Sequence, residues 1–165
     1  MKSKKGTTLI EVLLYTMITG FFVTTISLFA WSAISAKDKN DSIAKVNDST
    51  QIVIEEITKS IRNADSVIIP ANQGESSDTL TLHYADGTVR TFTVTEGKVI
   101  MQHLSDSYKI SSDQTTINSL NFQNISRPST PGIIQIQLKI SRTNPNNIQD
   151  FSAENEITIS ESLRQ

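Results

Sequence analysis

The chain has 165 residues, of which 19% are charged and 6% aromatic, and its net charge is −2. This length allows one modest domain beside a membrane segment, and the charge balance offers no basic surface of the kind that a dedicated nucleic-acid binder uses. The sequence contains no cysteine, which excludes disulfides, zinc–thiolate sites and thiol chemistry.

The chain begins with a short basic segment that leads into a long apolar one. Lys4, Lys5 and Gly6 come first, and between Leu9 and Ala36 the only charged side chain is that of Glu11. As a helix these residues would span about 42 Å, more than the roughly 30 Å hydrocarbon core of a bilayer. Lipid offers no hydrogen-bond partner to the backbone, so we expect this segment to be helical. A carboxylate inside it is costly and indicates a specific partner.

The residues Gly6-Thr7-Thr8-Leu9-Ile10-Glu11 resemble the N-terminus of type IV pilins and the related pseudopilins. In that family a prepilin peptidase cuts after the glycine of a basic leader, and the new N-terminus is methylated. The resemblance implies that the peptidase recognises Lys4, Lys5, Gly6 and Thr7, that it cuts after Gly6, and that Thr7 is then the site of N-methylation. Thr7 departs from the family, which usually has Phe or Met there.

The same resemblance implies a role for Glu11 in filament assembly. In the family, the fifth mature residue is a glutamate, which is proposed to neutralise the N-terminal ammonium of a neighbouring subunit. The expected partners are the prepilin peptidase, membrane lipid before assembly, and other pilin or pseudopilin subunits, contacted through the N-terminal helix. The implied location is the cytoplasmic membrane, with a cytoplasmic N-terminus, an extracytoplasmic globular domain and a surface or periplasmic filament. The sequence leaves open whether a pilus, a competence system or a type II secretion system contains it.

Two other interpretations of the apolar segment compete with this one. A secretory signal would be cut near Ala33-Ile34-Ser35, although signal cores have about 7–15 apolar residues and this segment is longer. A single-span anchor of a domain that does not assemble would be held with its lysines in the cytoplasm. Such an anchor has no use for Glu11, whereas an assembling subunit does.

A helical pattern continues beyond the apolar segment. Gly20 is the only helix breaker between Thr7 and Asp65, so the simplest prediction is a single helix over residues 7–65, about 88 Å long. Its second half carries one stripe of mostly apolar residues spaced by three or four. The stripe consists of Ile43, Val46, Thr50, Val53, Ile57, Ile61 and Ala64.

The remainder of the chain reads as strands and turns. Residues 79–84 alternate, the pair Asp86-Gly87 indicates a turn, and residues 89–94 form the returning strand of a hairpin. Residues 72–78, 126–132 and 144–147 read as loops. Further strands are expected at residues 98–104, 117–122, 133–140 and 156–160, and together they would form one antiparallel sheet of five to six strands.

The predicted fold class is therefore α+β, with the striped half of the long helix packed on the sheet. This arrangement is also the pilin-like lollipop that the resemblance implies, and the order of the later elements is similar to W- or J-type minor subunits. We expect a leader over residues 1–6, a transmembrane and assembly half over 7–36, an amphipathic half over 37–65 and a globular β-sheet domain over 66–165.

Residues suited to catalysis or metal binding are few. His83 and His103 are the only histidines, and neither lies at a ligand spacing from a second histidine or an acid. No nucleophile elbow, phosphate-binding loop or calcium loop occurs. The sequence thus predicts a structural subunit and not an enzyme, with no cofactor, no bound metal and no direct nucleic-acid binding.

Overall fold

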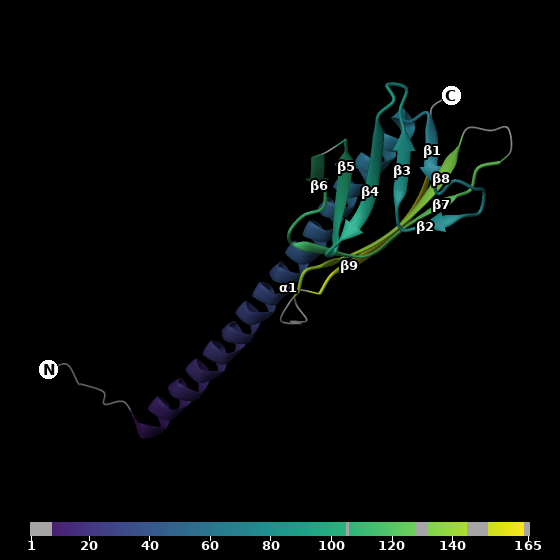
Figure 1. Ribbon diagram of the computed structural model, residues 1–165. Helices are drawn as coiled ribbons and strands as arrows, with labels where there is room; N and C mark the ends of the chain where they lie inside the picture. Colours follow the sequence, from purple (N-terminus) through teal and green to yellow (C-terminus); the bar gives the residue numbers. More distant parts are fainter. Residues whose placement is uncertain (1–7, 105, 128–131, 145–151, 164–165) are drawn as a thin grey trace. The chain divides into compact units, whose positions relative to one another are not determined.

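The computed structural model describes residues 8–104, 106–127, 132–144 and 152–163 (Figure 1). Within them the chain forms one helix followed by strands, which is the predicted α+β class. It divides into two compact units, Met1–Asp38 and Lys39–Gln165. The elements are α1 (Leu9–Asn63), β1 (Ser66–Ile69), β2 (Ser76–Ser77), β3 (Leu80–His83), β4 (Val89–Thr95), β5 (Lys98–His103), β6 (Asp106–Lys109), β7 (Thr115–Asn124), β8 (Ile133–Arg142) and β9 (Glu154–Ser162).

Helix α1 is continuous over 55 residues. At its start, the carbonyl of Thr8 accepts hydrogen bonds from the backbone N–H groups of Glu11 and Val12. Gly20 does not interrupt the helix, and a Cβ placed there would meet nothing within 4 Å. The predicted start at Thr7 lies outside the described residues.

The second half of α1 buries the predicted stripe, with one exception. Val46, Thr50, Val53, Ile57, Ile61 and Ala64 are all buried, which confirms the period. Ile43 was predicted to belong to the stripe and does not, because its side chain is 42% exposed. Ser42 is buried in its place and accepts a hydrogen bond of 3.0 Å from Nη1 of Arg142. The small side chain of Ser42 leaves room for Arg142 of β8 to approach the helix.

The strands form two antiparallel sheets, so the prediction of a single sheet was wrong. One sheet has five strands in the order β1-β3-β4-β5-β6, and the other has four in the order β2-β7-β8-β9. All six predicted strands are present, and the Asp86-Gly87 turn closes the β3–β4 hairpin with Gly87 at a φ of 79°. Three strands were not predicted: β1, β2 and β6. They have two to four residues each and are mostly exposed, so they carry no alternating apolar pattern.

The two sheets meet at the turn between β4 and β5. Glu96 and Gly97 both have positive φ, at 52° and 70°, which is typical of a tight two-residue hairpin turn. The carbonyl of Gly97 accepts a hydrogen bond of 2.9 Å from the N–H of Ile117 on β7. A Cβ on Gly97 would lie 2.9 Å from Cγ2 of Thr116, so the close approach of the sheets requires glycine here.

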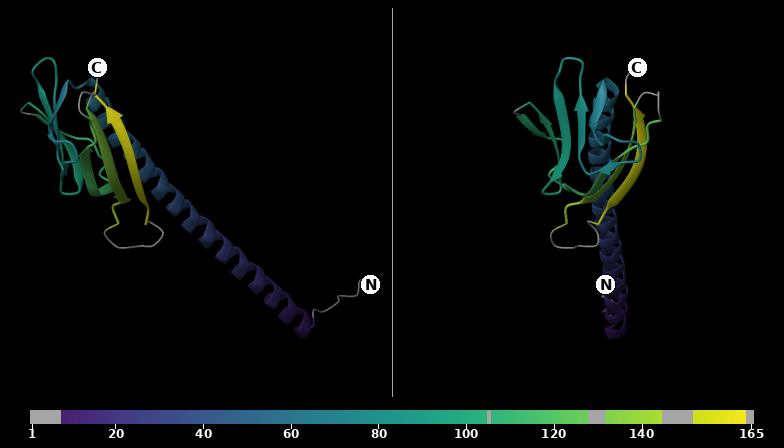
Figure 2. Two further views of the ribbon diagram at one scale, coloured as in Figure 1. Left: turned by 90° about the vertical axis from the view of Figure 1, so that its right-hand side faces the viewer. Right: turned by 45° about the vertical axis from the view of Figure 1, so that its right-hand side comes forward.

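A single hydrophobic core fills the second unit. In Figure 2 both sheets lie on one side of the second half of α1. The core residues come from this half of the helix and from the inner faces of both sheets. Those with no exposed surface are Val53, Ile57, Ile61, Ala64, Leu80, Leu82, Phe92, Val99, Phe122, Ile134, Ile136, Leu138 and Ile140.

Candidate functional site

The first half of α1 is covered by apolar side chains that contact no other part of the described chain. Every residue from Thr8 to Ile34 is exposed, and Leu9, Phe29 and Trp31 expose 80%, 76% and 75% of their surface. An apolar surface of this extent is rare on soluble monomers and marks contact with a membrane or another protein. The segment is long and apolar enough to cross a bilayer, and it is the one such helix in the described part of the chain.

Glu11 lies in the first turn of this helix, where a side chain on the same face of the helix donates a hydrogen bond to its carboxylate. The hydroxyl of Tyr15 donates a hydrogen bond of 3.2 Å to Oε1 of Glu11, one helical turn away. One oxygen of the carboxylate thus has a partner within the helix, while the second oxygen has no hydrogen-bond partner within the described residues. A carboxylate in apolar surroundings needs further donors or a counter-charge.

Four hydroxyl groups of this half are satisfied by the backbone of the helix itself. Thr16 donates to the carbonyl of Leu13, and Thr24, Thr25 and Ser27 donate to carbonyls four residues earlier, at 2.8–2.9 Å. Such bonds remove the cost of placing a hydroxyl in lipid. Glu11 therefore differs from these polar residues, because the helix satisfies them and only partly satisfies Glu11.

Four of the predicted site residues cannot be placed. Lys4, Lys5, Gly6 and Thr7 lie outside the described residues, and the predicted recognition, cleavage and methylation of this segment stay predictions. Glu11 is described and lies on the exposed apolar helix.

The two histidines lie on different strands of the five-stranded sheet. His83 on β3 pairs with Val89, and His103 on β5 pairs with Asp106 of β6. The pKa of Asp86 is lowered, chiefly because Thr88 donates hydrogen bonds from its hydroxyl and its N–H, with a smaller contribution from the charge of His103. The sequence alone did not indicate that Asp86 and Asp106 lie near His103. No group of three or more His, Asp or Glu side chains able to hold a metal occurs among the described residues.

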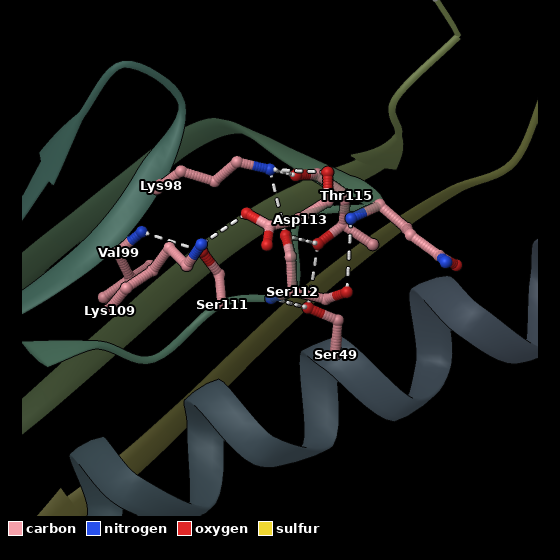
Figure 3. A network of polar contacts seen from close by, with 9 residues as sticks. Ser49, Lys98, Val99, Lys109, Ser111, Ser112, Asp113 and Thr115 are labelled. Carbon is pink, nitrogen blue, oxygen red and sulfur yellow. Dashed lines mark hydrogen bonds and ion pairs between the residues drawn. The ribbon is translucent and has the colours of Figure 1, made fainter.

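A polar network ties both sheets to the helix (Figure 3). The ammonium of Lys98 donates to the backbone carbonyls of Ser112 and Asp113, in the connection between β6 and β7, and to that of Thr115 at the start of β7. The hydroxyl of Ser49 on α1 lies 2.9 Å from that of Thr115. A lysine that donates hydrogen bonds to three carbonyls fixes the path of the chain from one sheet to the other. We therefore infer that this cluster stabilises the fold.

The same connection carries an ion pair between Lys109 and Asp113. The hydrogen bond and charge of Lys109 lower the pKa of the Asp113 carboxyl, and Lys98 adds to this effect. The pair is exposed, and its partners are satisfied within the cluster. It therefore offers no reactive group for a substrate.

Comparisons with protein-family models, with curated proteins and with solved structures found no match.

Proposed function

We propose that this protein is a minor pilin or pseudopilin, a structural subunit of a type IV pilus-like filament. In this proposal a prepilin peptidase removes residues 1–6 by cutting after Gly6. The membrane segment holds the subunit until its helix is transferred into a filament. The β-sheet unit is then displayed on the filament, and the protein performs no catalysis and needs no cofactor.

The observation that carries the proposal is Glu11 on the exposed apolar half of α1, at a spacing of five residues from Gly6. A cut after Gly6 creates an ammonium at Thr7. Either ion alone is costly in an apolar environment, whereas a pair with further hydrogen bonds is tolerated. Glu11 of one subunit and the N-terminus of its neighbour would satisfy each other, which favours a defined register between adjacent helices.

The charges of the leader favour one orientation in the membrane. Lys2, Lys4 and Lys5 precede the apolar segment and are expected to stay on the cytoplasmic side. The sheets would then lie on the extracytoplasmic side. Without the leader the mature chain has 12 basic and 17 acidic side chains and a net charge of −5, which does not favour a DNA-binding role.

The test of the proposal is the charge-neutral substitution Glu11→Gln. It keeps the size of the side chain and removes its charge, so we expect unchanged membrane insertion and a loss of incorporation into filaments of about tenfold or more. Glu56→Gln, on the second half of the same helix, is the matched control and should incorporate normally. Incorporation of Glu11→Gln at the level of the unchanged chain would contradict the pairing role.

A second candidate function is a membrane-anchored binding domain that does not assemble. A groove beside β9, described below, favours it, because a binding surface serves an anchored domain as well as a subunit. In that case Glu11→Gln would leave the binding of a partner and the distribution of the protein unchanged.

A further inference from the structure

A groove runs along the second unit between α1 and β9. Its volume is about 870 Å³, and one wall is a side of α1 that extends from Asn47 to Arg62. The other wall consists of the inward-facing residues of β9. The apolar middle of the groove is formed by Ile54, Ile157 and Ile159, which are only partly buried.

Two polar contacts close the groove at its ends. Nδ2 of Asn155 donates to Oδ1 of Asn47 at 3.0 Å, and Arg62 forms an ion pair with Glu161 at 3.1 Å. These contacts hold β9 beside the helix at both ends of the apolar stretch. The groove is thus a feature of the folded unit, with contacts between β9 and the helix at both ends.

Strand β9 is also the outermost strand of its sheet, as Figure 2 shows in yellow. The N–H of Leu163 donates to Gly132 and the carbonyl of Ala153 accepts from Arg142, and the register between β8 and β9 has no irregularity. Peptide groups of odd-numbered residues therefore face β8, and those of even-numbered residues face the open edge. The residues of β9 with peptide groups at this edge are Glu154, Glu156, Thr158, Ser160 and Ser162.

The other strands at sheet edges are short or irregular, whereas β9 is long and pairs regularly. Strand β2 has two residues, β6 has four, and β1 has an irregular register and is followed by Pro70. Short strands, bulges and prolines discourage pairing with another chain. Strand β9 has nine residues, contains no proline or lysine and pairs regularly along its length.

The charges beside this edge indicate the chemistry of an occupant. On the outer face of β9, Glu154 and Glu156 share one cation among the described residues, Lys139, which forms an ion pair with Glu154 and lies opposite Glu156. This face therefore carries one negative charge in excess at the edge. A strand with a lysine or arginine opposite Glu156 would balance it.

A second copy of this chain is a poor occupant for the edge. Strand β9 carries three glutamates and no lysine or arginine. Pairing with β9 of another copy would therefore add carboxylates to an edge that already carries excess negative charge, and it would bring no cation from that strand to balance them.

We propose that β9 and the adjacent groove bind an extended segment of a different protein by strand addition. The segment would pair antiparallel with β9, place apolar side chains over Ile54, Ile157 and Ile159, and present basic side chains to Glu154 and Glu156. Main-chain hydrogen bonds to the edge supply affinity, and the groove and the carboxylates supply specificity. This binding site does not depend on the proposed filament role.

The direct test uses the full chain in detergent micelles and a labelled nine-residue peptide as the probe. The peptide has isoleucine opposite Ile157 and Ile159, lysine opposite Glu154 and Glu156, and threonine elsewhere. We expect saturable binding by fluorescence anisotropy and none for a peptide of the same composition in scrambled order. No saturable binding at peptide concentrations up to about 1 mM would overturn the proposal.

Matched variants locate the binding. Ile54→Lys places a charge in the groove and should weaken binding about tenfold or more, whereas Ile52→Lys, on a part of the same helix outside the groove, should stay within about twofold. Thr158→Pro removes an N–H at the open edge and leaves the ladder to β8 intact, so it should also abolish binding. Equal binding by Ile54→Lys and Ile52→Lys would overturn the assignment of the groove.

A charge exchange tests the electrostatic part. Glu156→Lys should weaken binding of the lysine peptide and strengthen binding of a peptide with glutamate opposite residue 156. Loss of both peptides with a folded protein, or self-association of the chain that the peptide displaces, would contradict an occupant of the proposed chemistry.

Discussion

The two halves of α1 belong to one continuous helix and yet differ in what covers their apolar side chains. From Thr8 to Ile34 every side chain is exposed, whereas eight residues between Ser42 and Ile61 are buried. The second half is amphipathic and packs on the sheets of its own chain. The first half is apolar on all sides, and nothing in the described chain covers it.

The difference shows how one continuous helix can lie in two environments, one in each half. Most of the stability of a helix in a protein comes from packing of its apolar face. The second half obtains this packing within the chain, and the first half must obtain it from lipid or from other chains. The polar residues differ in part. Four hydroxyls of the first half bond to the helix backbone, as Thr50 does in the second half, whereas Ser42 and Ser49 of the second half contact Arg142 and Thr115 of the sheets.

The largest expected effect comes from truncating the same residue type in the two halves. Ile57 has no exposed surface, and Ile57→Ala should lower the free energy of unfolding of the sheet unit by about 2–5 kcal/mol. Ile26 is 64% exposed, and Ile26→Ala should leave this free energy unchanged. Denaturation of the full chain in detergent micelles, followed by circular dichroism, measures both. Equal losses would show that the halves do not differ as described.

The reverse experiment introduces a charge on exposed positions of both halves. Ile26→Asp should oppose membrane insertion by about 3 kcal/mol, because the charge would lie in hydrocarbon. Ile52 has a similar exposure, 55%, and Ile52→Asp should insert normally. Extraction of each variant from membranes with alkaline carbonate reports insertion. Full retention of Ile26→Asp would place this part of the helix outside the membrane.

A smaller effect is expected from the polar network that joins the sheets. Lys98→Met leaves the carbonyls of Ser112, Asp113 and Thr115 without their common donor, and we expect a loss of about 1–3 kcal/mol in the same denaturation experiment. The matched control is Lys45→Met, which removes a half-exposed ion pair with Asp41 and should change stability by less than about 1 kcal/mol. A similar loss in both variants would argue against a special role of Lys98.

The smallest effect is expected on the stability of the protein at acidic pH. Asp41, Asp86 and Asp113 have pKa values below the ordinary value of 3.8, mainly because of hydrogen bonds from Lys45, Thr88 and Lys109 respectively. Their contribution is fully present above 3.8 and disappears as the pH falls through the lowered pKa values. All three lie in the sheet unit. Asp113→Asn should therefore flatten the acid limb of its stability curve slightly, and an unchanged limb would contradict the assignment.

The sequence predicted those features that depend on neighbours along the chain. The stripe from Val46 to Ala64 follows from helical spacing, and the β3–β4 hairpin follows from Asp86-Gly87 between two alternating segments. Ile43 was misplaced because both Ser42 and Ile43 lie one turn before Val46, and only the approach of Arg142 decides between them. The groove beside β9 depends on contacts between α1 and β9 that join residues about 100 positions apart, and the division into two sheets depends on pairings such as that of Ser76 with Gln123, which no local pattern encodes.

The candidate site was predicted unevenly for the same reason. Glu11 stands out in sequence because it is the one charge in a long apolar segment, whereas its bond with Tyr15 becomes apparent only on a helix. The role of Lys4, Lys5, Gly6 and Thr7 rests on the resemblance and on chemistry that a peptidase would perform.

The measurement that tests the central claim most directly is the N-terminal sequence and mass of the protein from membranes of cells with and without a prepilin peptidase. A cut after Gly6 predicts a mature chain that starts at Thr7 only when the peptidase is present. A chain that starts at Met1 in both cells, or one that starts near Ala36, would contradict the proposed processing and with it the assignment to a filament.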